Sequence, residues 1–287
     1  MKILLGMSMQ EPKSATLRLA ARPGGGLDEF NVYYLAFKNH MGLVKVKLSP
    51  KEMVLSQTHL KTIAEVKALE YLLTGIEVLS QGRKGDSVQI TATSKSIKEI
   101  MLINTLSKPM RDKLLFEAKT LKYIKGTNLP LACYRVMCGL MPSLIARFLN
   151  ASIVISDDIK WIDPVVPEKN IHVHHSSEKI MHRADINGIG KLAITAHAYN
   201  RFVQRSKSNN PTQLWDYFLE TLRQPTLKQS PITDDMAEYH LQKYGTLARH
   251  YYDSKTRWHF VVVDEDDELV LVTSFLPELN LNDYTNR

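Results

Sequence analysis

The sequence contains few cysteines and no long hydrophobic run, and these absences exclude several classes of protein. Cys133 and Cys138 are the only cysteines among 287 residues, which excludes the disulfide framework of small secreted proteins. Both lie in an apolar region, so we expect two reduced thiols in a core. No stretch of 18 apolar residues occurs, and the apolar run after Lys2 is too short for the core of a signal peptide. We therefore expect a cytoplasmic protein without a membrane segment.

Glycine and proline are also scarce, at 13 and 12 residues, while 44% of the residues are hydrophobic and 23% are charged. This composition is typical of a folded globular protein and excludes a largely disordered chain. A chain of 287 residues exceeds the usual size of one domain and can bury two hydrophobic cores. The sequence therefore predicts two domains.

Acidic residues are scarce in the first half of the chain. Residues 1–150 contain 22 of the 37 Lys and Arg but 11 of the 30 Asp and Glu, a net charge of +11, whereas residues 151–287 carry −4. Such an excess favours a polyanionic partner, because each phosphate that a cation neutralises releases counterions. We expect this partner to be RNA or a ribonucleoprotein, and the sequence predicts no particular oligomeric state. The alternative is a basic surface that only keeps the protein in solution.

Turn-forming residues divide the chain into segments. The run Arg22–Gly26 contains proline and three glycines, so residues 1–29 are predicted to form an extended arm. Periodic patterns predict a first domain over residues 30–156. The stretch 157–190 is rich in Asp, Pro, Gly and His and is predicted to be a linker, which leaves residues 191–287 as a second domain.

Alternating and helical patterns predict the elements of the first domain. We expect a hairpin of two strands, a helix with one apolar face, a third strand, two further helices, a short strand and a last helix. These elements are predicted at residues 31–37, 43–48, 60–80, 87–93, 97–106, 109–125, 129–136 and 142–149. The helix that Pro109 opens carries five cations that we predict to bind RNA, namely Arg111, Lys113, Lys119, Lys122 and Lys125.

Helix caps and a hairpin pattern predict the second domain. Thr195 can cap a helix that runs to about Ser206, and Asn210-Pro211 begins another helix that Pro225 ends. Strands at residues 257–264 and 269–275 flank an acidic turn. We expect a small α+β domain of two helices followed by an antiparallel sheet, beside a first domain of mixed α/β type.

Two runs in the first domain, Thr62–Leu73 and Val88–Ile97, resemble the ribonuclease H-like fold. In that family a helix with an acidic residue precedes a strand that ends in an Asp-Ser pair. The resemblance covers about residues 30–150 and implies a mixed sheet with helices, with Glu65 as the helix acid. It also implies two divalent ions held by about four carboxylates.

The other acids of that pattern are missing from this sequence. Thr93 stands where the Asp of the strand is expected, and neither the predicted first strand, Val32–Phe37, nor the last helix at Ser143–Leu149 contains an acid. One carboxylate cannot hold two divalent ions, so we expect a domain that binds RNA without cutting it. The alternative is that Glu65 is a solvated helix residue in an unrelated α/β domain.

The segment Ile194–Arg205 resembles the opening of the barnase, EndoU, colicin and RelE-like nuclease group, and the resemblance covers residues 192–277. Phage and toxin members of that group often begin with a Thr-x-His-Ala-x-x-Arg helix and close with strands that end in Thr. Here the closing strand, Leu269–Ser274, contains Thr273. The resemblance implies an endoribonuclease that needs no metal.

The spacing of His197, Arg201 and Arg205 places an imidazole and two guanidiniums on one side of a helix. RNA cleavage without a metal requires a base, an acid and cations that stabilise the phosphorane. His197 suits proton transfer because its reference pKa lies near neutrality. An additional cation, a second proton donor and a hydroxyl for the phosphate are predicted further along the chain, at Arg249, His250, Tyr251 and Thr273.

Each of these residues also has a structural interpretation. A helix histidine after a Thr cap is often hydrogen-bonded to a carbonyl, and arginines four residues apart often form a solvated face. A transition-metal site at His172, His174, His175 and His182 is a further alternative, but no carboxylate or cysteine spacing supports it. We expect neither a metal nor a cofactor.

Three hypotheses from different classes remain open. The first is a metal-independent endoribonuclease whose basic N-terminal domain holds the RNA. The second is a non-catalytic RNA- or ribonucleoprotein-binding protein of phage or mobile-element origin. The third is a protein-interaction inhibitor of a host enzyme. The sequence favours the first, because the His-Arg-Arg face is present where the metal-binding acids are absent.

Overall fold

The computed structural model contains two compact units, each built around a six-stranded sheet. Unit 1 comprises Met1–Met141 and Phe148–Glu178, and unit 2 comprises Pro142–Arg147 and Lys179–Arg287. The structure describes residues 15–36, 40–50, 52–53, 55–79, 85–106, 108–127, 129–140, 144, 147–162, 165–178, 180–206, 211–265 and 267–276. Both units combine helices with mixed sheets, so the predicted mixture of α and β structure is confirmed.

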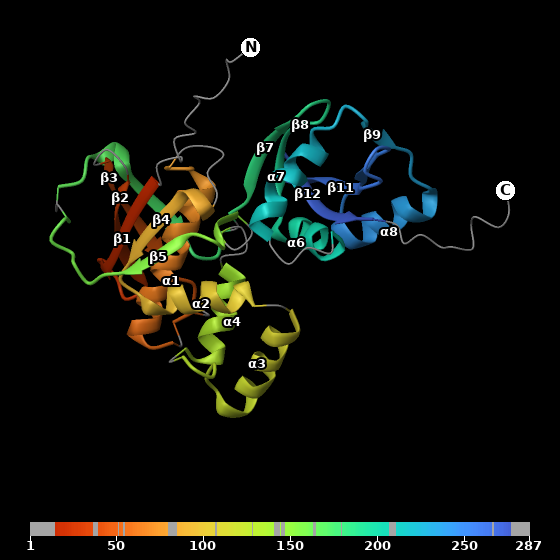
Figure 1. Ribbon diagram of the computed structural model, residues 1–287. Helices are drawn as coiled ribbons and strands as arrows, with labels where there is room; N and C mark the ends of the chain where they lie inside the picture. The colour runs from red at the N-terminus through yellow and green to blue at the C-terminus, as the bar shows by residue number, and fades with distance from the viewer. Residues whose placement is uncertain are drawn as a thin grey trace, which may run out of the picture. The chain divides into compact units, whose positions relative to one another are not determined.

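The sheet of unit 1 has the strand order β5-β4-β1-β2-β3-β6 (Figure 1). Strands β1, β2 and β3 are antiparallel neighbours, whereas β4 pairs parallel to β1, β5 to β4, and β6 to β3. The strands are β1 Ala15–Pro23, β2 Glu29–Ala36, β3 His40–Lys47, β4 Val88–Ala92, β5 Ser152–Ile155 and β6 Ile171–His175. The hairpin of β2 and β3 agrees with prediction, and part of its turn, residues 37–39, lies outside the described residues.

Helix α1 covers one face of this sheet and packs against β1, β2 and β3. Its apolar face, which includes Leu60, Ile63 and Leu69, is fully buried. The helices of unit 1 are α1 Gln57–Glu70, which continues as the π-helix η2 Tyr71–Gly75, then α2 Lys95–Thr105, α3 Lys108–Leu121 and α4 Leu131–Leu140, with short 3-10 turns at η3 Gly85–Ser87 and η4 Glu168–Asn170. Figure 1 shows α3 beyond α2 and α4, apart from the sheet.

Three predictions for unit 1 are wrong. The predicted arm contains β1, which lies between β2 and β4, because alternate residues from Ala15 to Ala21 are buried. The predicted strand at 129–136 is helix α4, in which Leu131, Tyr134 and Met137 are buried at helical spacing. The predicted linker contributes β6, which extends the sheet beside β3. The predicted helix at 142–149 lies largely outside the described residues.

The sheet of unit 2 has the strand order β7-β8-β12-β11-β10-β9. Only β8 and β12 are parallel neighbours, and the other described pairs are antiparallel. The elements are β7 His182–Ile186, β8 Gly190–Ile194, α6 Ala196–Arg205, α7 Pro211–Leu222, β9 Leu227–Ser230, α8 Asp234–Tyr244, β10 Ala248–Asp253, β11 His259–Glu265 and β12 Glu268–Phe275. The two predicted helices after Thr195 and the predicted C-terminal hairpin are confirmed.

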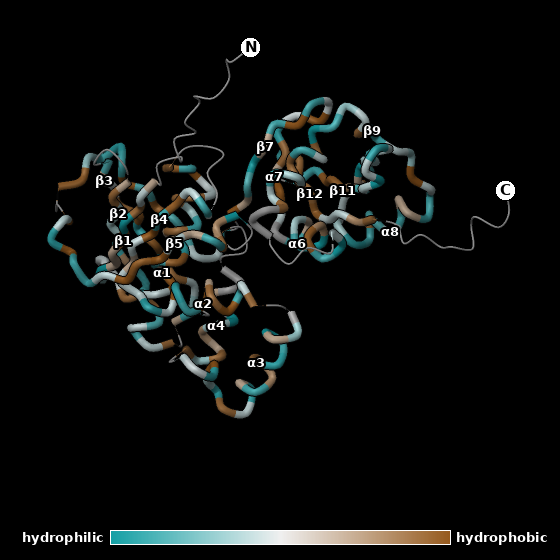
Figure 2. The backbone as a smooth tube through the Cα atoms, viewed as in Figure 1, coloured by the Kyte–Doolittle hydropathy of each residue, from teal (hydrophilic) through white to brown (hydrophobic). Residues whose placement is uncertain are grey.

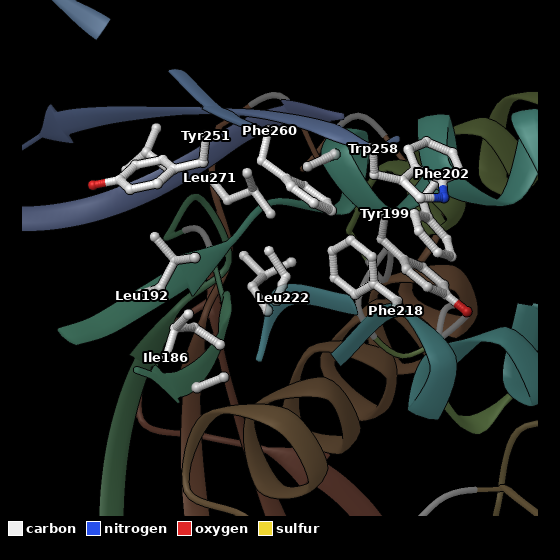
Figure 3. Close-up of a cluster of buried hydrophobic side chains, with 14 of the residues drawn as sticks. Ile186, Leu192, Tyr199, Phe202, Phe218, Leu222, Tyr251, Trp258, Phe260 and Leu271 are labelled. Carbon is white, nitrogen blue, oxygen red and sulfur yellow. The ribbon is translucent and has the colours of Figure 1, made fainter. Parts of the chain in front are cut away.

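An aromatic core joins α6 and α7 to one face of this sheet, as Figure 3 shows. Phe202 of α6 stacks on Trp258 with ring centroids 4.2 Å apart, and Phe218 of α7 meets Phe202 edge to face. Burial of these rings fixes α6 against the sheet. A smaller cluster that includes Val261 and Val263 fills the other face, on the side where Tyr244 of α8 packs.

Several elements of unit 2 are not predicted from the sequence. The predicted linker contains β7 and part of β8, and β9, α8 and β10 were not expected. Helix α8 has a single buried residue, His240, so it lacks the apolar stripe that predicts a helix. Among the described residues no helix is long and apolar enough to span a membrane.

Candidate functional site

Glu65 of α1 is a fully buried carboxylate of unit 1, with 0% of the residue exposed. Its oxygens accept hydrogen bonds from the backbone N–H groups of Ala21 at 3.3 Å and Ser94 at 3.0 Å, and from the hydroxyl of Thr93. Glu65 therefore joins α1 to the end of β1 and to the residues that follow β4. Burial raises the pKa of Glu65, and these hydrogen bonds oppose the rise.

The surroundings of Glu65 do not fit the two divalent ions that the ribonuclease H resemblance implies. Each Glu65 oxygen already accepts a hydrogen bond, and its neighbour Thr93 supplies a donor instead of a second carboxylate. β4 lies between β5 and β1, so the first strand of the sheet is β1 and not the predicted Val32–Phe37, and β1 also contains no acid. Among the described residues no three His, Cys, Asp or Glu side chains are placed to share a metal ion.

The histidines considered as metal ligands belong to different units. His172, His174 and His175 lie on β6 of unit 1, and His182 lies on β7 of unit 2. His174 Nδ1 is 3.0 Å from Glu178 Oε2. Burial, followed by the charge of a neighbouring lysine, lowers the pKa of His174 to about 4, so the ring is neutral at pH 7.

The five cations predicted to bind RNA lie on and after helix α3. Lys113, Lys119, Lys122 and Lys125 are exposed, and Arg111 is half-buried. Ala118 is the one buried side chain among those described on α3, and Leu114 and Leu115 beside it are half-buried, so one side of the helix packs inward and the rest faces solvent. Lys125 lies 3.6 Å from Glu117, and Asp112 is the other acid of α3, so these five cations exceed the acids of the helix by three.

Large apolar side chains are interleaved with these cations, and we call the combined set the α3 surface. Figure 2 shows hydrophobic and hydrophilic segments together along α3. Phe116 is 70% exposed, and the ammonium of Lys119 lies 5.6 Å from the centre of its ring. The other exposed apolar residues of the surface are Met110, Leu121 and Tyr123. Exposed rings among lysines offer stacking and charge together, which is the combination that single-stranded nucleic acid requires.

A second basic surface, which the sequence prediction missed, lies on the sheet face opposite α1. The β1–β2–β3 register places Arg22 and Lys45 on either side of Asn31, and Arg18 and Lys47 share their face. Arg22 also lies over the ring of a strand neighbour, Tyr33, at 5.8 Å. The alternation of charged and apolar residues along β1 was the available signal, and the adjoining Pro-Gly run obscured it.

Helix α6 carries His197, Arg201 and Arg205 as predicted, and all three side chains are exposed. The hydroxyl of Thr195 caps the helix by accepting a hydrogen bond from the N–H of Ala198 at 3.1 Å. The apolar side of α6 is buried, which directs the His-Arg-Arg side outward.

The charge around His197 comes from two helices. Partial burial lowers the pKa of His197, and the charges of Arg201 and of Lys243 on α8 lower it further. Lys243 was not predicted as a site residue. Its ammonium lies 5.0 Å from the ring centre of Tyr244 and 5.4 Å from that of Tyr239. A lowered pKa favours the neutral imidazole at pH 7, which is the form that can accept a proton as a base.

The structure does not bring the other predicted catalytic residues to this face. Arg249 forms an ion pair with Asp264 at 2.9 Å. His250 is buried, with its Nε2 3.4 Å from Nε2 of His240, and burial lowers its pKa to about 4. Tyr251 is part of the aromatic core. Arg249 is thus held in an ion pair, and His250 and Tyr251 are buried.

Thr273 points away from α6 because of an irregularity in β12. The register between β11 and β12 shifts at Val261 and Val262, so that Thr273 pairs with Val261. Paired residues share a face, and Val261 belongs to the cluster on the side opposite α6. Ser274, the residue after Thr273, lies beside α6 instead and donates a hydrogen bond to the carbonyl of Ala198 at 2.7 Å.

Comparisons with models of protein families, with curated proteins and with solved structures find no match to this chain.

Proposed function

We propose that the protein binds RNA through the α3 surface of unit 1 and that this unit does not cut the RNA. The observation that carries the proposal is the exposure of the α3 surface, where four lysines and the rings of Phe116 and Tyr123 face solvent. Lysine neutralises phosphates, and exposed aromatic rings stack on bases. The net charge of +11 over the first 150 residues supports the same partner.

The position of Glu65 supports a ribonuclease H-like origin for unit 1 without its reaction. The resemblance places the helix acid beside the end of a strand, and Glu65 of α1 does contact Thr93 and Ser94 after β4. The carboxylate that would hold a metal ion instead accepts hydrogen bonds from its neighbours. We propose that this position has a structural role.

The proposal is tested by titrating the full chain with structured and single-stranded RNA at several salt concentrations. We expect binding at low salt and a steep loss of affinity between about 50 and 200 mM salt. The salt slope is the slope of the logarithm of the affinity against the logarithm of the salt concentration. Replacing Lys113, Lys119 and Lys125 by Ala should lower its magnitude by roughly 0.7 for each phosphate of a single strand that is no longer neutralised. A triple variant with Lys169, Lys191 and Lys228 replaced by Ala, all at exposed positions outside the α3 surface, keeps the same change in net charge and is the matched control. An unchanged slope in the triple variant of the α3 surface would contradict the proposal.

A second function, metal-independent RNA cleavage in unit 2, is favoured by one observation. His197 and Arg201 are exposed on one side of α6, and the charges of Arg201 and of Lys243 on α8 lower the pKa of His197. A neutral imidazole can accept a proton while neighbouring cations stabilise a phosphorane. Single-turnover cleavage in EDTA tests this function, and His197→Ala should lower the rate on the order of 10²–10⁴-fold. Equal rates for parent and variant would make His197 a surface residue without catalytic function.

A further inference from the structure

A pocket of about 620 Å³ lies where α3 ends, between the following turn and the start of α4. Three cations, Lys119, Lys122 and Arg135, line it, and Tyr123, Pro130 and Leu131 add an aromatic and apolar wall. No acidic residue is among the described residues that line this pocket. Its volume is in the range of pockets that hold one small organic ligand. The charge and the size together indicate a site for a single anionic group with an apolar part.

Lys122 occupies a backbone conformation that usually requires glycine. It follows the last residue of α3 with a φ of 66°, in the left-handed region. Its N–H donates to the carbonyl of Ala118 at 2.8 Å, and its own carbonyl accepts from the N–H of Leu131 at 2.9 Å. Glycine is the common residue at this position of a helix end, because a side chain strains the left-handed backbone conformation. A strained residue of this kind often marks a functional site, and here the side chain brings an ammonium to the pocket.

Tyr123 is held in place by the same turn. It forms a bridge with Pro130, and the neighbouring Ile124 and Leu129 are fully buried and joined by a 2.9 Å backbone hydrogen bond. The Tyr123 side chain itself is 53% exposed. An exposed ring on an anchored turn loses little conformational freedom when a ligand stacks on it.

We propose that this pocket binds one unpaired nucleotide of a single-stranded RNA. The base lies against Tyr123 and Pro130, and the adjoining phosphates contact Lys119, Lys122 and Arg135. The inference rests on the proposed RNA-binding function and specifies which form of RNA is bound. A duplex keeps its bases paired and stacked, so it cannot insert one into the pocket, whereas a single strand can.

The surroundings of the pocket favour a nucleotide within a chain over a free nucleotide. The positive charge continues along α3 at Arg111 and Lys113, which do not line the pocket. Phe116 adds a second exposed ring on the same helix. A free mononucleotide would use none of these groups, whereas a strand that extends from the pocket passes over them.

The test compares the full chain with two variants on two RNAs, a single strand of about 12 nucleotides and its duplex, a length within the site sizes usual for single-strand binders. Tyr123→Ala should weaken single-strand binding roughly fivefold to 100-fold, the usual effect of losing one stacked base. Lys122→Gly should also weaken it while leaving the fold intact, because glycine favours this conformation. The parent should bind the duplex more weakly than the single strand, and Tyr123→Ala should leave duplex binding unchanged because paired bases do not stack on the ring. Lys122→Gly should weaken the binding of both RNAs, since its ammonium neutralises a phosphate in either. Lys169→Ala is the control.

The outcomes separate the pocket from the proposed function. If the parent binds neither RNA, the proposed function is wrong and the inference is wrong with it. If the parent binds RNA but both variants bind single strands as tightly as the parent does, the pocket inference alone is overturned. A third arm adds adenosine monophosphate to the complex. Complete displacement of the single strand by a micromolar concentration would show a site for free nucleotides and would also overturn the inference.

Discussion

Thr93 donates its hydroxyl hydrogen bond to Glu65 Oε1, so the residue that follows β4 and the acid of α1 are directly joined. The backbone N–H groups of Ala21 and Ser94 donate to the same carboxylate. A buried acceptor with this many donors stabilises the packing of α1 on the sheet, because loss of any partner leaves a buried polar group unpaired. The ribonuclease H resemblance implies metal ligands at Glu65 and at the position of Thr93, and here these two side chains are hydrogen-bonded to each other.

Thr93→Asp should destabilise unit 1 without creating a metal centre. The substitution places a second carboxylate against a buried one and removes the hydroxyl donor, which should cost about 3 kcal/mol of unfolding free energy. Thr93→Val, which only removes the donor, should cost about 1 kcal/mol. Thermal melts with and without Mg²⁺ measure both effects. A large Mg²⁺-dependent rise in the melting temperature of Thr93→Asp, with cleavage of an RNA–DNA hybrid, would show that the site can hold metal.

The sequence predicts best those elements that carry both a cap and an apolar stripe. Helix α6 has Thr195 as a cap and a buried stripe with Tyr199 and Phe202, and it is confirmed. Helix α8 also has a Thr cap, at Thr233, and ends at Gly245 in the left-handed region, but its exposed surface offers no stripe to recognise. Caps alone were not enough to predict it.

The candidate site on α6 was predicted in part, because helical spacing fixes which side chains share a face of one helix. The sequence cannot place residues that come from other strands in the same way. Thr273 was expected beside His197, but the register shift at Val261 turns it to the opposite face of the sheet. The charge of Lys243 on α8 also lowers the pKa of His197, and no local sequence pattern indicates this influence.

Unit 2 should lose stability as the pH falls below 6.5. Burial lowers the pKa of His250 to about 4 and that of His182 to about 3, and for His182 the charge of Arg147 contributes as well. In the unfolded chain both groups titrate near 6.5, so below that pH the unfolded state binds more protons. The stability that these neutral histidines contribute to unit 2 is fully present above pH 6.5. It declines as the pH falls toward 4, by about 1.4 kcal/mol of unfolding free energy per pH unit for each histidine. Urea unfolding of parent and His250→Gln at several pH values measures the slope.

His250→Gln should reduce this slope by the share of one histidine. His175→Gln, at an exposed position on β6 of unit 1, is the matched control. If the slope of His250→Gln equals that of the parent, protonation of His250 does not limit the stability of unit 2.

Arg201→Ala should raise the pKa of His197. The guanidinium of Arg201 disfavours the charged imidazole, and its removal leaves only partial burial and Lys243 to lower the pKa. Lys243→Ala should shift the pKa in the same direction. NMR titration of the His197 ring protons measures the shift. Arg205, one turn further along α6, provides the control, and a shift in Arg205→Ala as large as that in Arg201→Ala would contradict the arrangement.

Lys122→Gly should make unit 1 more stable by about 0.5 kcal/mol. A side chain at a positive φ costs roughly 1 kcal/mol of folding free energy, which glycine would recover. Part of this gain is offset because glycine has more conformational freedom in the unfolded chain. Lys122→Ala keeps the strain and removes the charge, so it should not share the gain. Urea unfolding curves of the three proteins decide between these outcomes. A destabilised Lys122→Gly would mean that the lysine side chain itself stabilises the turn.

The cations on the open sheet face should add to RNA binding by the α3 surface. Arg22 and Lys45 flank Asn31 in the strand register, so they lie close enough to bind neighbouring phosphates of one strand. Replacing both by Ala should lower the salt slope for single-stranded RNA by roughly 1.4, the value for two phosphates that are no longer neutralised. Lys191→Ala with Lys228→Ala, at exposed positions of unit 2, keeps the same change in net charge and is the matched control. Equal slopes in the two double variants would mean that the sheet-face cations act only through net charge, which would leave the α3 surface as the one RNA-binding region supported by the described residues.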